Sequence, residues 1–228
     1  MLNAQTLLLS EGFEGSMSSW SSFPNIITSE EVHSGSFSSK YKASLGASKS
    51  IPPSTEVYFK QWLYFPVGFD WSVKGGKHFW RLIHDSSTYM VRQIDTQTGF
   101  VNQTVAFILF IGSNGQQQGP TYRMDIPFPE GKWFSFEYHI KLNDTLPMLS
   151  NGIVEAWIDG VPCPIYRGAP FNDVVPSLTN MNFNWDKPFN KFRLDTNYDN
   201  CPPSSDKCFW YSDDLEVWNG CPPGSPCY

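Results

Sequence analysis

The sequence has little charge and few of the residues that build metal or redox centres. Charged residues make up 17 % of the 228 residues, and histidine occurs four times. The net charge is −6, whereas proteins that bind nucleic acid present a basic face. The composition therefore argues against a nucleic-acid partner, and so low a charge content is unusual for a cytosolic enzyme.

Long apolar runs are also absent. No segment approaches the roughly 20 apolar residues that cross a bilayer, so we expect no membrane partner. Residues 1–9 lack the charged start and the long apolar segment of a signal peptide. We interpret Met1 as an expression start on a mature chain that is secreted and acts outside the cell.

The five cysteines have spacings that fit neither a zinc site nor a redox pair. Cys201 and Cys208 bound a short proline-rich loop, CPPSSDKC, and Cys221 and Cys227 bound another, CPPGSPC. We predict that both pairs form disulfides, which is typical of extracellular proteins. Cys163 is then left free or bonds to a second chain, which would allow self-association.

Helical periodicity is scarce, and aromatic residues are abundant. They make up 16 % of the chain and include nine Trp, while 17 Gly and 18 Pro are scattered along it. This composition predicts many turns and short strands, and therefore an all-β chain. At this length we expect one domain over residues 1–228, with a Cys- and Pro-rich tail at 219–228.

The stretch 57–82 shows the strand pattern most clearly. Residues 57–65, VYFKQWLYF, alternate large side chains on both faces, which predicts a central strand that is buried on both sides. Gly75-Gly76 breaks the pattern, and residues 77–83 predict a second strand. In that strand Lys77 and Arg81 share one face, and Trp80 lies on the other. Further along, Asp159-Gly160 predicts a hairpin turn.

Several short motifs resemble the concanavalin A-like jelly rolls. These are an FE…W opening at 13–20, an HSG-x-x-S turn at 33–38 and an aromatic ending with Asp-Asp at 211–215. The GKW…KLN…NG…W-I-DG pattern at 131–160 and the GGK segment at 75–77 are similar to jelly-roll polysaccharide lyases, the alginate and glucuronan lyases in particular. The resemblance implies a β-sandwich of two stacked antiparallel sheets and a polysaccharide partner.

The resemblance also implies a structural calcium ion. In many members of the group, carboxylates from the first and last strands share such an ion. The matching residues here are Glu14 with Asp213 or Asp214, and carboxylate oxygens are the ligands that calcium prefers. The alternative is that these are ordinary surface acids.

A uronate lyase needs a group that holds the sugar carboxylate, a base for the C5 proton and an acid for the leaving oxygen. This chemistry needs no cofactor. Arginine suits the first role because it pairs with carboxylates in a bidentate way. The candidates are Arg81 and Arg92 for the carboxylate, Lys77 and His78 for the base, and Tyr89 and Tyr122 for the acid.

Four further residues lie in a basic and amide-rich part of the chain and are predicted to contact sugar rings. They are Trp71, Lys74, Gln116 and Arg123. The same features fit a non-catalytic carbohydrate-binding module or a structural jelly roll that assembles with copies of itself. A glycoside hydrolase would need two carboxylates on one face, for which Asp214 and Glu216 are the nearest pattern.

Overall fold

The computed structural model describes residues 5–21, 26–41, 46–69, 77–84, 88–95, 104–113, 123–124, 126–142, 152–167, 173–175, 177–181, 188–195 and 209–227. Within these residues the chain is all-β with antiparallel pairing, as predicted. No helix in this part of the chain is long and apolar enough to span a membrane.

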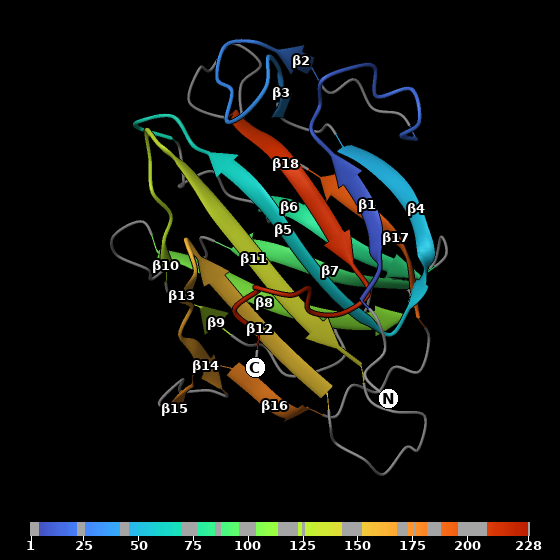
Figure 1. The fold of residues 1–228 in the computed structure, drawn as a ribbon. Helices are drawn as coiled ribbons and strands as arrows, with labels where there is room; N and C mark the ends of the chain where they lie inside the picture. The colour runs from blue at the N-terminus through green and yellow to red at the C-terminus, as the bar shows by residue number, and fades with distance from the viewer. Residues whose placement is uncertain are drawn as a thin grey trace.

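Two large sheets stack face to face, with the nine-stranded one in front in Figure 1 and the six-stranded one behind it. The larger sheet runs β13 (Val161–Pro162), β12 (Gly152–Ile158), β11 (Trp133–Lys141), β5 (Glu56–Tyr64), β18 (Trp210–Trp218), β3 (Ser38–Tyr41) and β2 (Ile26–Thr28). In addition, β1 (Leu7–Glu11) pairs with β18 and β16 (Ser177–Met181) pairs with β12.

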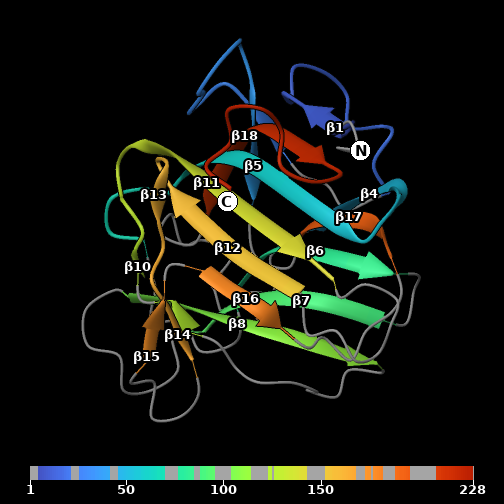
Figure 2. The ribbon, with the colours of Figure 1, turned by 60° about the horizontal axis from the view of Figure 1, so that its bottom comes forward.

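The second sheet runs β10 (Ile126–Pro127), β8 (Thr104–Ser113), β7 (Thr88–Asp95), β6 (Lys77–His84), β17 (Phe189–Asp195) and β4 (Gly46–Ser54). A small third sheet joins β15 (Asp173–Val175), β14 (Ile165–Arg167) and β9 (Arg123–Met124). Figure 2 shows this small sheet at one end of the sandwich. The arrangement is the predicted jelly-roll β-sandwich.

Aromatic side chains fill the space between the two sheets. Phe59 of β5 packs against Trp80 of β6, with ring centroids 4.6 Å apart, and against Phe192 of β17 at 5.2 Å. Trp80 also lies 4.6 Å from Tyr138 of β11. Burial of these large rings supplies the main driving force for folding, and it explains why aromatic residues are so frequent in the sequence.

Strand β5 is central, as predicted, but only one of its faces is fully buried. Phe59 and Leu63 point into the core, whereas Lys60, Trp62 and Tyr64 on the other face are half-buried. The expectation of burial on both sides is therefore correct only in part. The second face is the outer surface of the nine-stranded sheet, and the C-terminal loop covers part of it near Tyr58 and Lys60.

The predicted hairpin at Asp159-Gly160 is present between β12 and β13. Both residues have positive φ angles, 50° and 74°, as the tight two-residue turns of hairpins require. Strand β18 departs from regular pairing, because its register with β5 shifts between Asp213 and Glu216, and Asp214 has a φ of 44°. This bulge breaks the alternation that would have placed Asp214 and Glu216 on one face.

The C-terminal loop, residues 221–227, is closed by the predicted disulfide between Cys221 and Cys227. Cys163 is a free thiol in the core with 2 % exposure, and burial raises its pKa to about 12. A thiol in this position cannot reach a second chain in the folded state. Cys201 and Cys208 lie outside the described residues, and their pairing stays a prediction.

We expect one free thiol per chain under denaturing, non-reducing conditions. The disulfides at Cys221–Cys227 and at the predicted pair Cys201–Cys208 consume four of the five cysteines, and Cys163 remains. Thiol titration in denaturant, with and without prior reduction, measures this number directly. Three free thiols would show that the pair Cys201–Cys208 is reduced.

Candidate functional site

Three cationic residues lie on the outer face of the six-stranded sheet. In β6 and β17, Trp80 pairs with Leu194 and Leu82 with Phe192, and all four side chains are buried in the core. Because side chains alternate along a strand, the intervening Arg81, Arg193 and Lys191 point outward, and each is half-buried. We call these three residues the arginine face.

Arg81 and Arg193 are direct cross-strand partners in the register of β6 and β17. Directly opposed residues on antiparallel strands have Cβ atoms about 5 Å apart. The side chains of Arg81 and Arg193 therefore begin next to each other on the same face of the sheet. Lys191 follows two residues from Arg193, on the same face, opposite Ile83. In a chain of net charge −6, three cationic side chains thus lie close together on one face of this sheet.

The predicted catalytic residues fall on two neighbouring strands of this sheet. Lys77 and His78 begin β6, and Tyr89 and Arg92 lie in β7. The register pairs Arg92 with Trp80 and pairs Arg81 with Val91, with an irregularity between His78 and Trp80. Arg81 and Arg92 are therefore not opposite each other: Arg81 is opposite Val91 on β7 and Arg193 on β17. The irregularity also interrupts the alternation that placed Lys77 on the face of Arg81, so the predicted shared face of these two residues is not confirmed.

Of the four predicted sugar-binding residues, the structure describes only Arg123. Arg123 lies in β9 of the small third sheet, where it pairs with Tyr166. Trp71, Lys74 and Gln116 lie outside the described residues, and so does Tyr122, one of the two predicted catalytic acids.

The outer face of the nine-stranded sheet contains a second group of polar side chains. Glu137 of β11 is opposite Lys60 of β5, and Lys60 is opposite Glu216 of β18. The Lys60 Nζ atom lies 3.7 Å from Glu137 Oε1, and the Tyr58 hydroxyl donates a hydrogen bond to Glu137 Oε2. Burial, and then this hydrogen bond, raise the pKa of Tyr58 well above its ordinary value, so the phenol stays protonated.

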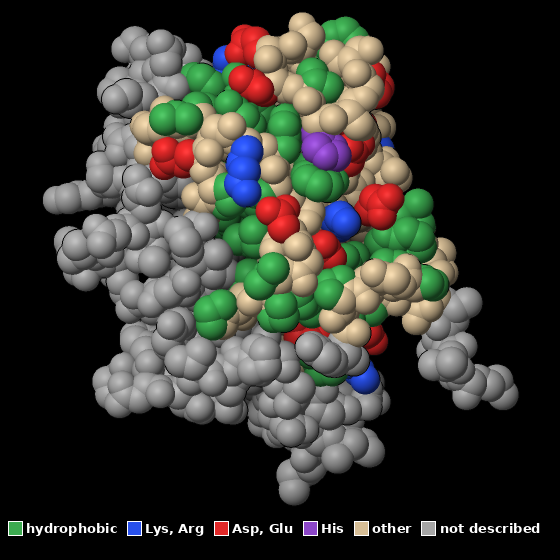
Figure 3. Space-filling view, turned by 60° about the vertical axis from the view of Figure 1, so that its left-hand side comes forward, with side chains coloured by type: hydrophobic (Ala, Val, Ile, Leu, Met, Phe, Trp, Pro, Cys, Tyr) green, Lys and Arg blue, Asp and Glu red, His purple; other side chains and the backbone are tan. Residues whose placement is uncertain are grey.

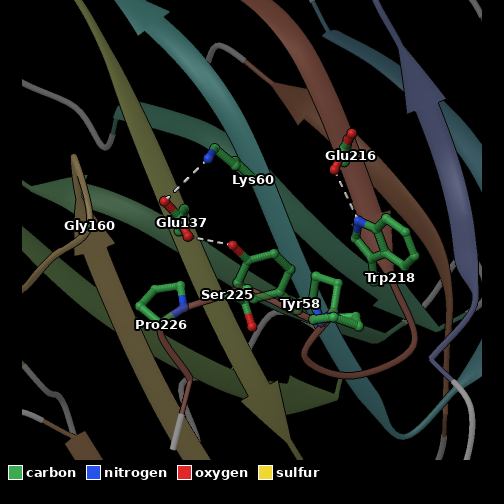
Figure 4. Close-up of a pocket in the computed structure, with 11 residues that line it drawn as sticks. Tyr58, Lys60, Glu137, Gly160, Glu216, Trp218, Ser225 and Pro226 are labelled. Carbon is green, nitrogen blue, oxygen red and sulfur yellow. Dashed lines mark hydrogen bonds and ion pairs between the residues drawn. The ribbon is translucent and has the colours of Figure 1, made fainter.

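A cavity of about 370 Å³ lies over this group, between strands β5, β11 and β18 and the C-terminal loop. Figure 4 shows Glu137 and Gly160 on one side of the cavity, Glu216 and Trp218 on the other, and Ser225 and Pro226 of the loop across it.

His139 lies next to this cavity in an ion cluster in which it and Glu155 are buried and Glu56 is partly exposed. Its Nδ1 atom is 2.8 Å from Glu155 Oε2 and its Nε2 atom is 3.0 Å from Glu56 Oε1. The Cys221 and Cys227 sulfur atoms lie within 4.8 Å of the ring nitrogen and of each other. The C-terminal loop thus covers His139, and because the two sulfurs are bonded to each other, this group is not a metal site.

Aromatic rings continue along the same outer face. The His33 ring stacks on Trp62 at 3.7 Å and meets the edge of Trp133 at 5.7 Å, while Tyr64 lies 5.7 Å from Trp133. Figure 3, which views the molecule from another side, shows hydrophobic side chains exposed among acidic and basic ones. Half-buried rings of this kind can stack on sugar rings, and they can equally close the outer surface of the sheet.

The predicted calcium ligands gather around the turn at residues 33–37. Both carboxylate oxygens of Glu14 accept hydrogen bonds from the Ser36 backbone N–H, at 2.8 and 3.0 Å. Asp213 accepts from the backbone N–H groups of His33 and Ser34, and Asp214 lies 2.7 Å from His33 Nδ1. Burial raises the pKa of Asp213 more than these N–H groups lower it.

Gly35 makes this arrangement possible. It has a φ of 68°, which strains other residues, and a Cβ atom on it would lie 2.1 Å from Glu14 Oε1, so a larger residue would displace the Glu14 carboxylate from the turn. Among the described residues, the ligand atoms of Glu14, Asp213 and Asp214 do not all lie within 4.8 Å of one another. The acids are therefore gathered at one turn, held by N–H donors, and not closed into a coordination shell. The structural calcium ion stays a prediction.

We expect a chelator to lower the melting temperature and added calcium to restore it, because an ion that binds only the folded chain stabilises it. Differential scanning calorimetry with and without a calcium-selective chelator measures the shift. The variant Glu14→Gln, which keeps its shape but loses its charge, should abolish the response to calcium. A parent melting curve that the chelator leaves unchanged would contradict the prediction.

Sequence reasoning missed Arg193, Lys191 and the cavity. Arg193 stands in the alternating segment FNKFRLD, which gave a usable signal for a strand with two cations on one face. The strand that carries Arg81, β6, lies about 110 residues earlier in the chain, and no local pattern identifies it as a partner of β17.

No family model and no curated protein sequence matches this chain. Solved structures are similar in fold. A marine PL-14 alginate lyase from Aplysia kurodai has a TM-score of 0.55 and 14 % identity, over 93 % of this chain and 98 % of that one. Alginate lyase vAL-1 from Chlorella virus has a TM-score of 0.52 and 13 % identity, over 85 % and 88 %.

The receptor-binding domain of botulinum neurotoxin type G is also similar, with a TM-score of 0.55 and 11 % identity. The match covers 94 % of this chain and 48 % of that one. At such identities the likeness shows the fold alone, which is the jelly roll described above.

Proposed function

We propose that this protein is an extracellular polysaccharide lyase that cleaves a uronate-containing polymer by β-elimination at the arginine face. The observation that carries the proposal is the direct cross-strand pair Arg81 and Arg193, with Lys191 beside it, in an acidic chain. The sugar carboxylates of a polyuronate are anions that such a face would bind. The jelly-roll fold, which two alginate lyases share, supports the same reaction class.

In this mechanism, guanidinium groups hold the uronate carboxylate and withdraw charge from it, so that the neighbouring C5 proton becomes acidic. A base then removes this proton, and an acid protonates the glycosidic oxygen as the bond to C4 breaks. We assign the carboxylate to Arg81 and Arg193. For the base, Lys77 and His78 at the start of β6 are the candidates, and for the acid, Tyr89 of β7 and Tyr122.

The test is a mixture of the protein with alginate, glucuronan and a neutral glucan, followed by ultraviolet absorbance. Elimination leaves an unsaturated uronate at the new non-reducing end, and its conjugated double bond absorbs in the ultraviolet. We expect absorbance to rise with at least one polyuronate and not with the glucan. A folded protein that produces no unsaturated product from any polyuronate would refute the lyase proposal.

A carbohydrate-binding module is the second candidate. The half-buried rings of Trp62, Tyr64 and Trp133 on the outer face of the nine-stranded sheet favour it, because aromatic faces bind sugar rings without any acid or base. Retardation of the protein in a gel that contains the polymer, with no unsaturated product, would support binding in place of elimination.

A further inference from the structure

The cavity under the C-terminal loop differs in chemistry and in place from the arginine face. It lies on the nine-stranded sheet, on the other side of the sandwich, and its volume of about 370 Å³ is in the range of small-ligand sites. It combines charged, aromatic and proline side chains, whereas the arginine face is cationic.

The floor of the cavity is a cross-strand row of alternating charge. Glu137, Lys60 and Glu216 are consecutive partners on β11, β5 and β18, and adjacent strands lie about 4.8 Å apart. The two carboxylates are therefore held roughly 10 Å apart at their backbones, with one ammonium group between them. Their sum is one negative charge, which disfavours a uronate and favours a ligand without negative charge.

The side walls hold these polar groups in fixed orientations. The Trp218 indole N–H donates to Glu216 Oε2 at 3.1 Å, and the Tyr58 hydroxyl and the Ser135 hydroxyl both donate to Glu137. The exposed Glu216 carboxylate keeps lone pairs for further donors, because a carboxylate accepts about four hydrogen bonds, whereas Glu137 is buried at 4 % exposure. The half-buried Trp218 ring stands beside them at the edge of the cavity (Figure 4).

The roof is the C-terminal loop, and its chemistry makes it rigid. The disulfide Cys221–Cys227 closes it, Pro222, Pro223 and Pro226 fix backbone angles within it, and the Ser225 backbone N–H donates to the Pro222 carbonyl at 3.1 Å. A preformed wall loses little conformational freedom when a ligand binds, which favours affinity.

We propose that this cavity binds a neutral hexose unit of a glycan. The apolar face of the sugar ring stacks on Trp218, its hydroxyl groups donate to Glu216, and the Lys60 ammonium group, held beside the buried Glu137, donates to a sugar oxygen. A flat ring that is apolar on its faces and carries donor hydroxyls around its edge matches a cavity with an aromatic wall and a carboxylate floor. The proposal is independent of elimination at the arginine face.

The experiment is isothermal titration calorimetry of the full chain with cellohexaose, mannohexaose, maltohexaose and an alginate oligosaccharide. We expect at least one neutral oligosaccharide to bind, and Trp218→Ala to weaken that binding about tenfold or more. Glu216→Gln should weaken it too. Trp218 is half-buried and Glu216 is exposed, so both variants should fold, which circular dichroism would verify.

Two controls separate this site from the others. Lys49→Gln, in edge strand β4 of the other sheet, and Ile26→Ala, an exposed apolar residue in edge strand β2 of the same sheet, should bind the neutral oligosaccharide as the parent does. The proposal is overturned if none of the neutral oligosaccharides binds. It is also overturned if folded Trp218→Ala binds like the parent, or if the alginate oligosaccharide competes for the same site.

Discussion

A chain in which leucine replaces His139 is expected to lose about 3–5 kcal/mol of unfolding free energy, measured by urea denaturation at neutral pH. The imidazole ring lies between Glu155 and Glu56, at 2.8 and 3.0 Å. The side chains of His139 and Glu155 are 2 % and 1 % exposed. Removal of the ring leaves Glu155 as a buried charge with no positive partner in this cluster, and such a charge is strongly destabilising.

The contribution of His139 should depend on pH in one direction. Burial by itself lowers the pKa of the ring, but the hydrogen bonds to Glu155 and Glu56 outweigh burial, and the pKa is raised above its ordinary value. The folded chain therefore binds the proton more tightly than the unfolded chain. The contribution is complete below about pH 6.5, the unfolded value, and is lost as the pH rises through the raised folded value. The parent should lose stability over this alkaline window, and the leucine variant should not show that loss.

Two further variants test the cause. The double variant His139→Leu with Glu155→Leu should recover much of the lost stability, because both charges leave the core together. Glu56→Gln should cost about 1 kcal/mol or less, since Glu56 is 37 % exposed and solvent screens its charge. A His139→Leu chain that unfolds at the urea midpoint of the parent would contradict the prediction.

The sequence predicted where strands occur in the chain better than it predicted which strands pair with each other. Alternation in residues 57–65 and 77–83 correctly located β5 and β6 and put Trp80 in the core. It could not show the register irregularity between His78 and Trp80, which interrupts the alternation of β6. The turn at Asp159-Gly160 was equally local, since positive φ angles favour these two residues. Strand pairing is not local, and the pairing of β6 with β17 depends on the closure of the whole sandwich. The sequence therefore could not predict that Arg193 lies opposite Arg81.

The cavity was hidden from the sequence for a related reason. The loop between Cys221 and Cys227 was predictable as a disulfide loop, but nothing in its seven residues indicates that it packs over His139 and Tyr58. The bulge in β18 also breaks the alternation on which the pairing of Asp214 and Glu216 depended. Asp214 contacts the turn at His33, and Glu216 lines the cavity.

Replacing either Arg81 or Arg193 with glutamine is expected to lower the rate of polyuronate elimination about 10- to 100-fold. The figure follows from the loss of one charge-assisted hydrogen-bonding partner of the sugar carboxylate, at about 1.5–3 kcal/mol. The measurement is the initial rate of unsaturated-product formation, with urea denaturation as the check on folding.

Conservative and matched variants show which property matters. Arg193→Lys keeps the charge but not the planar fork that binds a carboxylate through two hydrogen bonds, so its rate should lie between those of the parent and Arg193→Gln. Lys191→Gln removes a charge from the same strand face, two residues further along, and should have a smaller effect. The rates of both variants should fall further as salt rises, since salt screens the remaining charges. If Arg81→Gln and Arg193→Gln both eliminate at the parental rate, the carboxylate binds elsewhere, and the arginine face is not the site of cleavage.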